Sequence, residues 1–208
     1  MGRVLMEKVQ IFPTEIFIFE NPNIDNEALI AKTKTLYNVE IKKTTTLSML
    51  YNLGKEPEFK ELYDWFAECL EEIRVKQKYD CEKIEITNSW FNVALGGYQM
   101  FQNYHKHSMS MFSGVYYLSE GAATSFEDPE VHRSEAELEI LRFDYQPWYH
   151  SDARPGKLVI FPSWLYHRTD PHFGSNDRYV ISFNSFPTGR INHNLATDSK
   201  ITIQVKHD

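Results

Sequence analysis

The chain has 208 residues, of which 42% are hydrophobic and 25% are charged, which suits one globular domain with a core of ordinary size. Its net charge of −7 argues against a general attraction to nucleic acid or to anionic membranes. The two cysteines lack a partner motif and no apolar run is long enough to span a membrane, so we expect a cytoplasmic protein without disulfides.

The first part of the chain is expected to contain an edge strand and a helix. Residues 8–19 alternate in a strand-like way around Pro13, and a proline in a strand favours the edge of a sheet. Asp25 is a suitable N-cap for a helix that is expected to end near Asn38. Residues 40–54, rich in Thr and Lys, are expected to form a loop.

A second helix is expected after Pro57, because apolar side chains recur from Phe59 to Ile73 with the spacing of one buried helical face. Beyond Tyr79 the pattern changes to short β-rich runs separated by Gly, Pro, Asp and Ser. The candidate strands are residues 83–95, 98–104, 109–118, 123–127, 137–143, 157–161, 178–186 and 200–206.

Two helices followed by about eight strands predict a mainly β fold with an N-terminal α part, namely a cupin-like jelly roll buttressed by the helices. No linker separates the two parts, so the prediction is a single domain over residues 1–208. Its helical buttress would span about residues 24–78, its jelly-roll core about residues 83–186, and an extra C-terminal strand about residues 200–206.

Residues 103–117, with the sequence NYHKHSMSMFSGVYY, place two histidines at the start of a β-branched and aromatic run. In an extended backbone, alternate residues point to the same face, so His105 and His107 would lie side by side. Both imidazoles could then bind one metal ion, although a His-x-His pair on a strand is also a common surface feature.

A second cluster, PGKLVIFPSWLYH at residues 155–167, predicts a turn and a buried strand, and ends in His167. Eleven residues later, Arg178 opens the run RYVISFN. Arg178, Ser182 and Asn184 would share one face of that strand, while the opposite face is apolar. The polar face is expected to line a cavity, because buried polar groups need partners, and the apolar face is expected to pack against the helices or a second sheet.

The order of these motifs, from H-x-H and SGVYYL to RYVISFN, resembles the 2-oxoglutarate/iron(II)-dependent oxygenases over about residues 88–186. The most similar branch has uncharacterised members, often from phages or bacteria. The resemblance implies a double-stranded β-helix and a hydroxylase that uses iron(II), 2-oxoglutarate and dioxygen. It also implies that His105 and His167 bind the metal and that Arg178 grips the C5 carboxylate of 2-oxoglutarate. The primary substrate, a small molecule or a protein side chain, is left open.

One position departs from the family pattern, because His107 stands where the 2-His-1-carboxylate triad has an acid. The first hypothesis is a three-histidine iron site made of His105, His107 and His167. The second is a triad completed by Asp128 or Glu127, although an Asp before Pro is also typical of a turn. The third is a zinc site, since three histidines and a water are a known zinc ligand set.

Two further residues are expected to contact the cosubstrate. Ser182 shares the face of Arg178, and the hydroxyl of Tyr117 would reach the cosubstrate if the strand from His105 ran unbroken. The other histidines lie in polar or loop contexts and are expected to be solvated. They are His132, His150, His172, His193 and His207.

Two alternatives to the oxygenase come from other classes of protein. One is a cupin-like metalloenzyme that does not use 2-oxoglutarate, and the other is a non-catalytic jelly-roll binding module. Arg178 distinguishes among them. An oxygenase needs Arg178 to face the metal, whereas a binding module predicts that it is exposed or paired with an acid.

Overall fold

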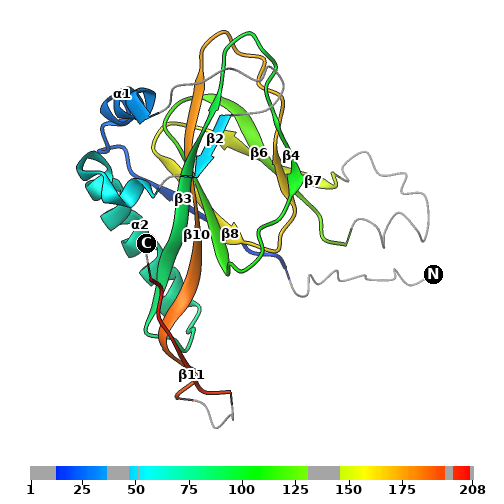
Figure 1. The fold of residues 1–208 in the computed structure, drawn as a ribbon. Helices are drawn as coiled ribbons and strands as arrows, with labels where there is room; N and C mark the ends of the chain where they lie inside the picture. The colour runs from blue at the N-terminus through cyan, green and yellow to red at the C-terminus, as the bar shows by residue number, and fades with distance from the viewer. Residues whose placement is uncertain (1–12, 37–46, 51, 131–145, 195–198, 207–208) are drawn as a thin grey trace, which may run out of the picture.

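The computed structural model describes residues 13–36, 47–50, 52–130, 146–194 and 199–206. In these residues two antiparallel sheets face each other, and two helices lie against the outer side of the larger sheet (Figure 1). The predicted class, a mainly β jelly roll with an N-terminal helical buttress, is confirmed.

The larger sheet has the strand order β1-β8-β5-β10-β3-β2, and β11 extends it by pairing with β10. Every pairing in it is antiparallel. Its strands are β1 (Phe17–Glu20), β2 (Leu47–Leu50), β3 (Lys83–Ala94), β5 (Phe112–Tyr117), β8 (Lys157–Pro162), β10 (Arg178–Ile191) and β11 (Ile201–Ile203).

The smaller sheet has the strand order β4-β9-β6-β7 and is also antiparallel. Its strands are β4 (Gln102–His105), β6 (Gly121–Glu127), β7 (Trp148–Ala153) and β9 (His167–Thr169). Because β4 lies beside β9, the end of the first histidine motif meets the start of the strand that follows the second motif.

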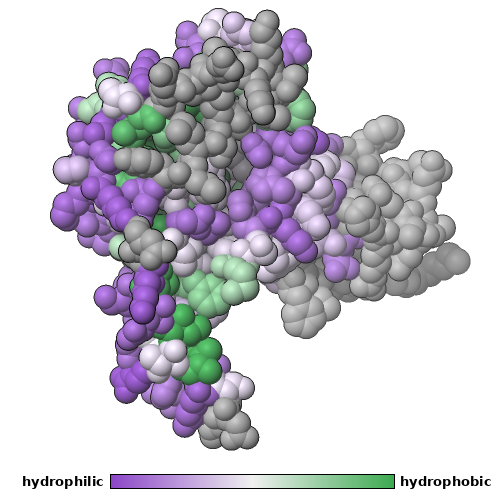
Figure 2. All heavy atoms as spheres, in the orientation of Figure 1, coloured by the Kyte–Doolittle hydropathy of each residue, from purple (hydrophilic) through white to green (hydrophobic). Residues whose placement is uncertain are grey.

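The helices are α1 (Asn26–Leu36) and α2 (Lys60–Lys76), and the short 3-10 turns η1 (Leu53–Lys55) and η2 (Pro57–Phe59) precede α2. The Asp25 carboxylate accepts a hydrogen bond from the Ala28 N–H at 3.0 Å, which confirms the predicted N-cap. Hydrophilic residues dominate the surface over both helices in Figure 2, as the amphipathic pattern requires.

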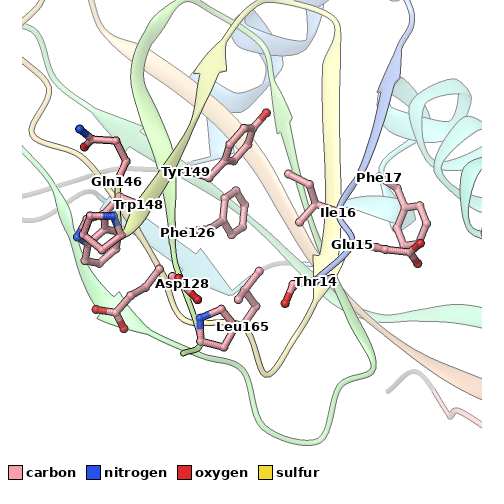
Figure 3. Close-up of a pocket in the computed structure, with 13 residues that line it drawn as sticks. Thr14, Glu15, Ile16, Phe17, Phe126, Asp128, Gln146, Trp148, Tyr149 and Leu165 are labelled. Carbon is pink, nitrogen blue, oxygen red and sulfur yellow. The ribbon is translucent and has the colours of Figure 1, made fainter. Parts of the chain in front are cut away.

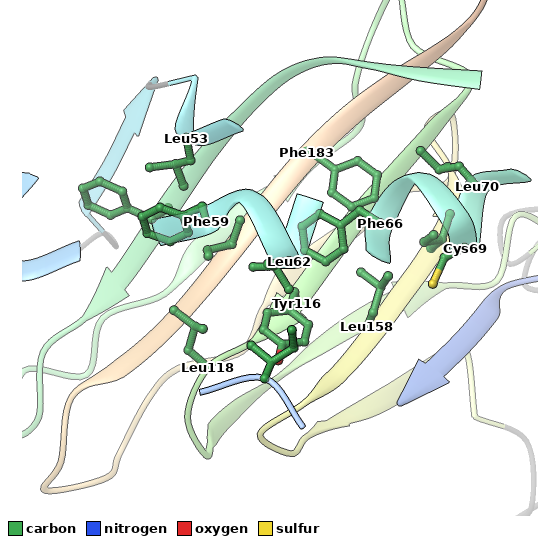
Figure 4. Packing of buried hydrophobic residues seen from close by; sticks show 14 of the residues in the cluster. Leu53, Phe59, Leu62, Phe66, Cys69, Leu70, Tyr116, Leu118, Leu158 and Phe183 are labelled. Carbon is green, nitrogen blue, oxygen red and sulfur yellow. The ribbon is translucent and has the colours of Figure 1, made fainter. Parts of the chain in front are cut away.

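The outer core lies between α2 and the larger sheet (Figure 4). Phe66 of α2 is fully buried, and its ring lies 4.9 Å from that of Phe183 and 5.6 Å from that of Tyr116. Phe183 belongs to the apolar face of β10, so that face packs against the helices as predicted. Gly114 on β5 is needed there, because a Cβ would come within 2.3 Å of the Phe183 ring.

A second, inner core lies between the two sheets and closes one side of the barrel. It contains Val115 and Tyr117 of β5, Phe126 of β6, Phe161 of β8 and Val180 of β10. The inner face of the larger sheet is apolar only in this part. The rest of that face is polar and includes Arg178 and Ser182 of β10.

Several predicted boundaries were wrong. Residues 40–54 were expected to form a loop, but Leu47–Leu50 pairs with β3, and η1 follows. The strands β7 and β9 were not predicted, because β7 lies in a polar stretch and β9 has three residues, which is too short for a clear alternation. The candidate strand 137–143 lies outside the described residues.

Replacement of Phe66 by alanine tests whether α2 is a structural buttress. We expect Phe66→Ala to lower the free energy of unfolding by about 3–5 kcal/mol, because it leaves a cavity among buried rings. Val75→Ala on the same helix is the matched control, since Val75 is 57% exposed, and should change stability by less than about 0.5 kcal/mol. Urea denaturation followed by circular dichroism measures both, and equal losses would contradict the packing described.

Candidate active site

Three histidines meet between the two sheets. His105 ends β4 and lies directly opposite His167, the first residue of β9. His107 follows two residues later, and its backbone N–H donates a hydrogen bond to the Ser163 carbonyl at 3.0 Å. One ligand atom from each of the three side chains lies within 4.8 Å of the other two, which is close enough for one metal ion to bind all three.

Backbone carbonyls fix the tautomers of two of these rings. Nδ1 of His105 lies 2.6 Å from the Asn103 carbonyl oxygen, and Nδ1 of His167 lies 3.0 Å from the Leu165 carbonyl oxygen. A carbonyl only accepts, so each Nδ1 carries the hydrogen and donates it. Each Nε2 then keeps its lone pair for a metal, which is how protein metal sites commonly orient histidine ligands.

The surroundings of the cluster keep two of its rings neutral. Burial, with a smaller contribution from His105, lowers the pKa of His167 to about 3 and that of His107 to about 4. The Phe161 ring lies 4.6 Å from His167, which explains part of this burial. Because only neutral imidazole binds a metal, the two ligands are ready to bind at neutral pH without losing a proton.

Neither acid considered as an alternative ligand belongs to the cluster. The carboxylate of Asp128 accepts a hydrogen bond from the Glu130 N–H at 2.9 Å, which is the turn expected of an Asp-Pro pair. Glu127 lies on β6, where its N–H donates to the Tyr166 carbonyl. Within the described residues, the three histidines are the one group of metal-ligand type that converges in this way.

The histidines line a cavity of about 210 Å³ that also contains Arg178 and Ser182. Its fully buried end holds Arg178, whereas Asn92, Gln102, His105 and His107 are partly exposed. The remaining wall residues are Trp90, Ser113, Gly114, Val115, Thr124, Phe161, His167, Thr169, Val180 and Phe183. The cavity therefore runs from an exposed mouth, past the histidines, to a buried guanidinium.

Arg178 is buried without an acidic partner in contact. Its Nε–H donates to the Ala122 carbonyl at 2.8 Å, and its Nη1 and Nη2 have no hydrogen-bond partner among the described residues. Burial lowers the pKa of this guanidinium, although an arginine stays charged at neutral pH. A buried cation with two free donors is costly unless an anion binds to it, and a bidentate carboxylate matches its geometry.

Gly121 and Tyr117 hold the Arg178 side chain in place. A Cβ on Gly121, whose φ is +150°, would come within 2.9 Å of the Arg178 stem, so the backbone can approach only as glycine. The Tyr117 ring lies 5.6 Å from the guanidinium carbon, in cation–π geometry. Gly121 was not anticipated, because a lone Gly at a strand start also reads as a turn.

The structure does not support the expected route by which Tyr117 would reach the cosubstrate. The strand does not run unbroken from His105, since β4 and β5 belong to different sheets. The Tyr117 hydroxyl donates instead to the Thr124 hydroxyl at 2.8 Å, and Tyr117 is not on the cavity wall. Ser182 does line the cavity on the Arg178 face, where it accepts a hydrogen bond of 3.4 Å from Asn92.

The other described histidines are separate from the cluster. His193 is exposed as expected, and His150 is 51% exposed with its Nδ1 near Ser125 and Asp170. The prediction of a solvated His172 was wrong, because this residue is 4% exposed and its Nε2 donates to the Asn176 carbonyl. The two remaining predicted positions, His132 and His207, lie outside the described residues.

A larger groove of about 910 Å³ lies between the edge strands β1 and β7 (Figure 3). Ile16, Phe126, Trp148, Tyr149 and Leu165 give it an apolar floor. It shares no lining residue with the histidine cavity, so the two are distinct. The phenylalanine in this floor has its ring centroid 6.1 Å from that of His167 and belongs to the wall between them.

A protein family and several solved structures are similar to this chain. Residues 88–184 match the model of the family described as Putative 2OG-Fe(II) oxygenase. No curated protein matches the chain.

Solved structures of low sequence identity share the fold. A prolyl-4-hydroxylase from Pseudomonas putida has 13% identity and a TM-score of 0.57, over 85% of this chain and 94% of that one. HygX from Streptomyces hygroscopicus, with nickel, 2-oxoglutarate and hygromycin B bound, has 12% identity and a TM-score of 0.59. The match covers 92% of this chain and 94% of HygX. The carbocyclase SnoK from nogalamycin biosynthesis has 9% identity and a TM-score of 0.64, over 93% and 90%.

Removal of single candidate ligands tests which residues bind the metal. We expect His107→Ala to lose most of its affinity for iron(II), because two imidazoles remain, and His107→Asp to keep it, because a carboxylate restores the usual triad. Asp128→Ala should bind iron(II) like the wild type, since its carboxylate is engaged in a turn. Anaerobic titration followed by equilibrium dialysis measures all four proteins. Retention by His107→Ala together with loss by Asp128→Ala would favour the acid as ligand.

Proposed function

We propose that this chain, whose residues 88–184 match the model of the 2OG-Fe(II) oxygenase family, hydroxylates a C–H bond with iron(II) bound by His105, His107 and His167. Arg178 would bind the C5 carboxylate of 2-oxoglutarate at the buried end of the same cavity. The observation that carries the proposal is the free pair of guanidinium nitrogens on Arg178, buried in the cavity that the three imidazoles line.

The charges of the cavity suit a dianionic cosubstrate. Its described wall residues include no Asp or Glu, while Arg178 contributes one positive charge. Three neutral imidazoles would leave the full charge of a divalent metal uncompensated by protein. The two negative charges of a dicarboxylate in this cavity would offset two of these three positive charges, and would leave the one that an acid at position 107 would otherwise balance.

The residues present therefore fit both groups. When bound, iron(II) and 2-oxoglutarate supply the activation of dioxygen and the oxidising power for hydroxylation. The chain supplies orientation, since the carbonyl-bound rings of His105 and His167 present Nε2 to the metal. Ser182 lies on the same strand face as Arg178 and would donate its hydroxyl to the same carboxylate.

The primary substrate would approach at the mouth of the cavity. Asn92 and Gln102 are partly exposed there, as are His105 and His107, whereas Arg178 is closed off from solvent. Deep binding of the cosubstrate leaves the mouth as the side from which a C–H bond can reach the metal. Burial of Phe161 and Val180 behind the cluster keeps water from the cosubstrate end.

The geometry of Arg178 disfavours the alternatives. A binding module with structural histidines leaves no reason to bury a cation with two unpaired donors. A zinc hydrolase or another cupin-like metalloenzyme could use the three histidines, but it would not need an anion site at the depth of Arg178. No described feature of the cavity specifically favours these readings.

Anaerobic addition of iron(II) and 2-oxoglutarate tests the proposed function directly. We expect a metal-to-ligand charge-transfer absorbance, because the cosubstrate would chelate the metal through its 2-oxo acid end. Absence of the band in a folded, metal-loaded sample would contradict 2-oxoglutarate chelation. Addition of zinc in place of iron is the control and should give no band.

Replacement of Arg178 by glutamine tests the proposed carboxylate site. We expect Arg178→Gln to weaken 2-oxoglutarate binding by at least about 30-fold, since loss of one partner of a buried charge pair costs about 2 kcal/mol or more. Metal affinity should be unchanged, and the cosubstrate-free protein should not lose stability, because the variant removes an unpaired buried charge. Arg168→Gln, on the outer face of the smaller sheet, is the control. Equal cosubstrate affinities for both variants would contradict the assignment.

A further inference from the structure

We infer that a buried network of three serine hydroxyls and one asparagine amide positions His107 for the metal. The network consists of Ser110, Ser113, Ser163 and Asn184. The inference rests on the proposed three-histidine site and assigns a role to residues outside the ligand set. Three of them, Ser113, Ser163 and Asn184, come from the motifs SGVYY, FPSWLYH and RYVISFN, and the proposed function gives these three side chains no contact with the metal or the cosubstrate.

His107 needs support that the other two ligands do not. The rings of His105 and His167 are each fixed by a carbonyl, whereas the ring nitrogens of His107 have no hydrogen-bond partner among the described residues. Its ring instead lies 5.4 Å from that of Trp90. The orientation of His107 therefore depends mainly on where its backbone is held.

The backbone of His107 belongs to a loop that is exposed on one side. Residues 106–111 connect β4 in one sheet to β5 in the other, and Met109 at the tip is 85% exposed with a left-handed φ of 52°. Two backbone hydrogen bonds join this loop to Ser163. The His107 N–H donates to the Ser163 carbonyl, and the Ser163 N–H donates to the Met111 carbonyl. Ser163 thus holds the loop together with Ser185, whose carbonyl accepts a hydrogen bond from the Met111 N–H at 2.8 Å.

The side chain of Ser163 is the centre of the network. Its Oγ lies 2.7 Å from Oγ of Ser110, inside the loop, and 2.8 Å from Oγ of Ser113, on β5. The Ser113 hydroxyl donates to Oδ1 of Asn184, on β10, at 2.8 Å. The loop is therefore connected through Ser163 to two strands of the larger sheet.

The hydroxyl hydrogens of the three serines can form one continuous chain of donors and acceptors. Ser110 donates to Ser163, Ser163 donates to Ser113, and Ser113 donates to the asparagine oxygen of Asn184. Every hydroxyl then donates once and accepts once or more, since Ser110 also accepts from the N–H of Ser185 at 3.3 Å. Such a chain is cooperative, and removal of its centre takes from Ser113 its donor and breaks the link to Ser110, whose hydroxyl can then donate only to the carbonyls of Phe112 at 3.0 Å or Ser185 at 3.2 Å.

The burial of the network also indicates that it holds the loop in place. Ser163 and Ser113 are 0% and 2% exposed, and Asn184 is 9% exposed, so the bonds are shielded from water. Ser113 also lines the cavity. The network thus borders the cavity, where a shift of the loop would move His107 relative to His105 and His167.

Replacement of Ser163 by alanine tests the inference with cobalt(II) as the metal probe. We expect a 10- to 100-fold loss of cobalt(II) affinity, about the size found when residues that orient metal ligands are removed. The visible spectrum of the bound cobalt should shift toward that of His107→Ala, because the third imidazole is displaced. Absorbance titration measures both, and thermal unfolding without metal measures stability.

Ser125→Ala is the matched control, because Ser125 is also fully buried and has two hydrogen bonds of 2.6 Å, on the outer face of the smaller sheet. It should lose stability without losing cobalt affinity. Wild-type affinity and spectrum in Ser163→Ala, or an equal loss of affinity in Ser125→Ala, would overturn the inference.

Two further proteins keep the result interpretable. If Ser163→Ala fails to fold, Ser110→Ala takes its place, because it removes a half-buried member of the same network. Ser110→Ala should lose less cobalt(II) affinity than is expected of Ser163→Ala, and an affinity equal to that of the wild type would overturn the inference. Failure of the wild type to bind cobalt(II), or full binding by His107→Ala, would contradict the three-histidine site itself. Normal wild-type binding with unchanged serine variants would contradict only the role of the network.

Discussion

The strict alternation of side chains along β10 is the constraint on which the rest of the structure depends. Successive residues of a strand point to opposite faces, so one strand can serve a dry core and a polar cavity at once. Phe183 and its apolar neighbours pack under α2, while Arg178 and Ser182 face the histidines. A shift of one residue in the pairing with β3 or β5 would put the guanidinium into the outer core. The helical buttress therefore fixes the register that places Arg178 and Ser182 in the cavity of the histidines.

The two-residue period also explains how much could be predicted from the sequence. The faces of β10, the strand before His167 and the amphipathic α2 each follow from a repeated local pattern, and the structure has all three. The convergence of His105 and His167 follows from no local pattern, because it arises from the pairing of β4 with β9 across about sixty residues of chain. Only the ordered motifs of a known family indicated it.

The parts that could not be predicted are those in which tertiary context overrides local signals. β9 has three residues and owes its conformation to its neighbours β4 and β6, since so short a strand carries no alternation. The misplaced Tyr117 hydroxyl has the same origin, because the sequence does not reveal that the chain changes sheets between His105 and Ser113. The burial of His172 depends on its carbonyl partner at Asn176, in a turn that composition alone does not specify.

Polar groups of the site are already buried in the structure without any ligand, and this burial decides which ligands they favour. Arg178 loses hydration without a full set of partners, and the low pKa of His167 reflects the same loss for an imidazole. The cost of burying Arg178 would be offset when an anion meets the guanidinium, whereas His167 stays neutral and available to a cation. Under the proposed function the two ligands would be coupled: the dianion would lower the cost of a metal held by neutral ligands, and the metal would lower the cost of burying the dianion. A carboxylate at position 107 would reduce this coupling, because it would offset part of the charge of the metal itself.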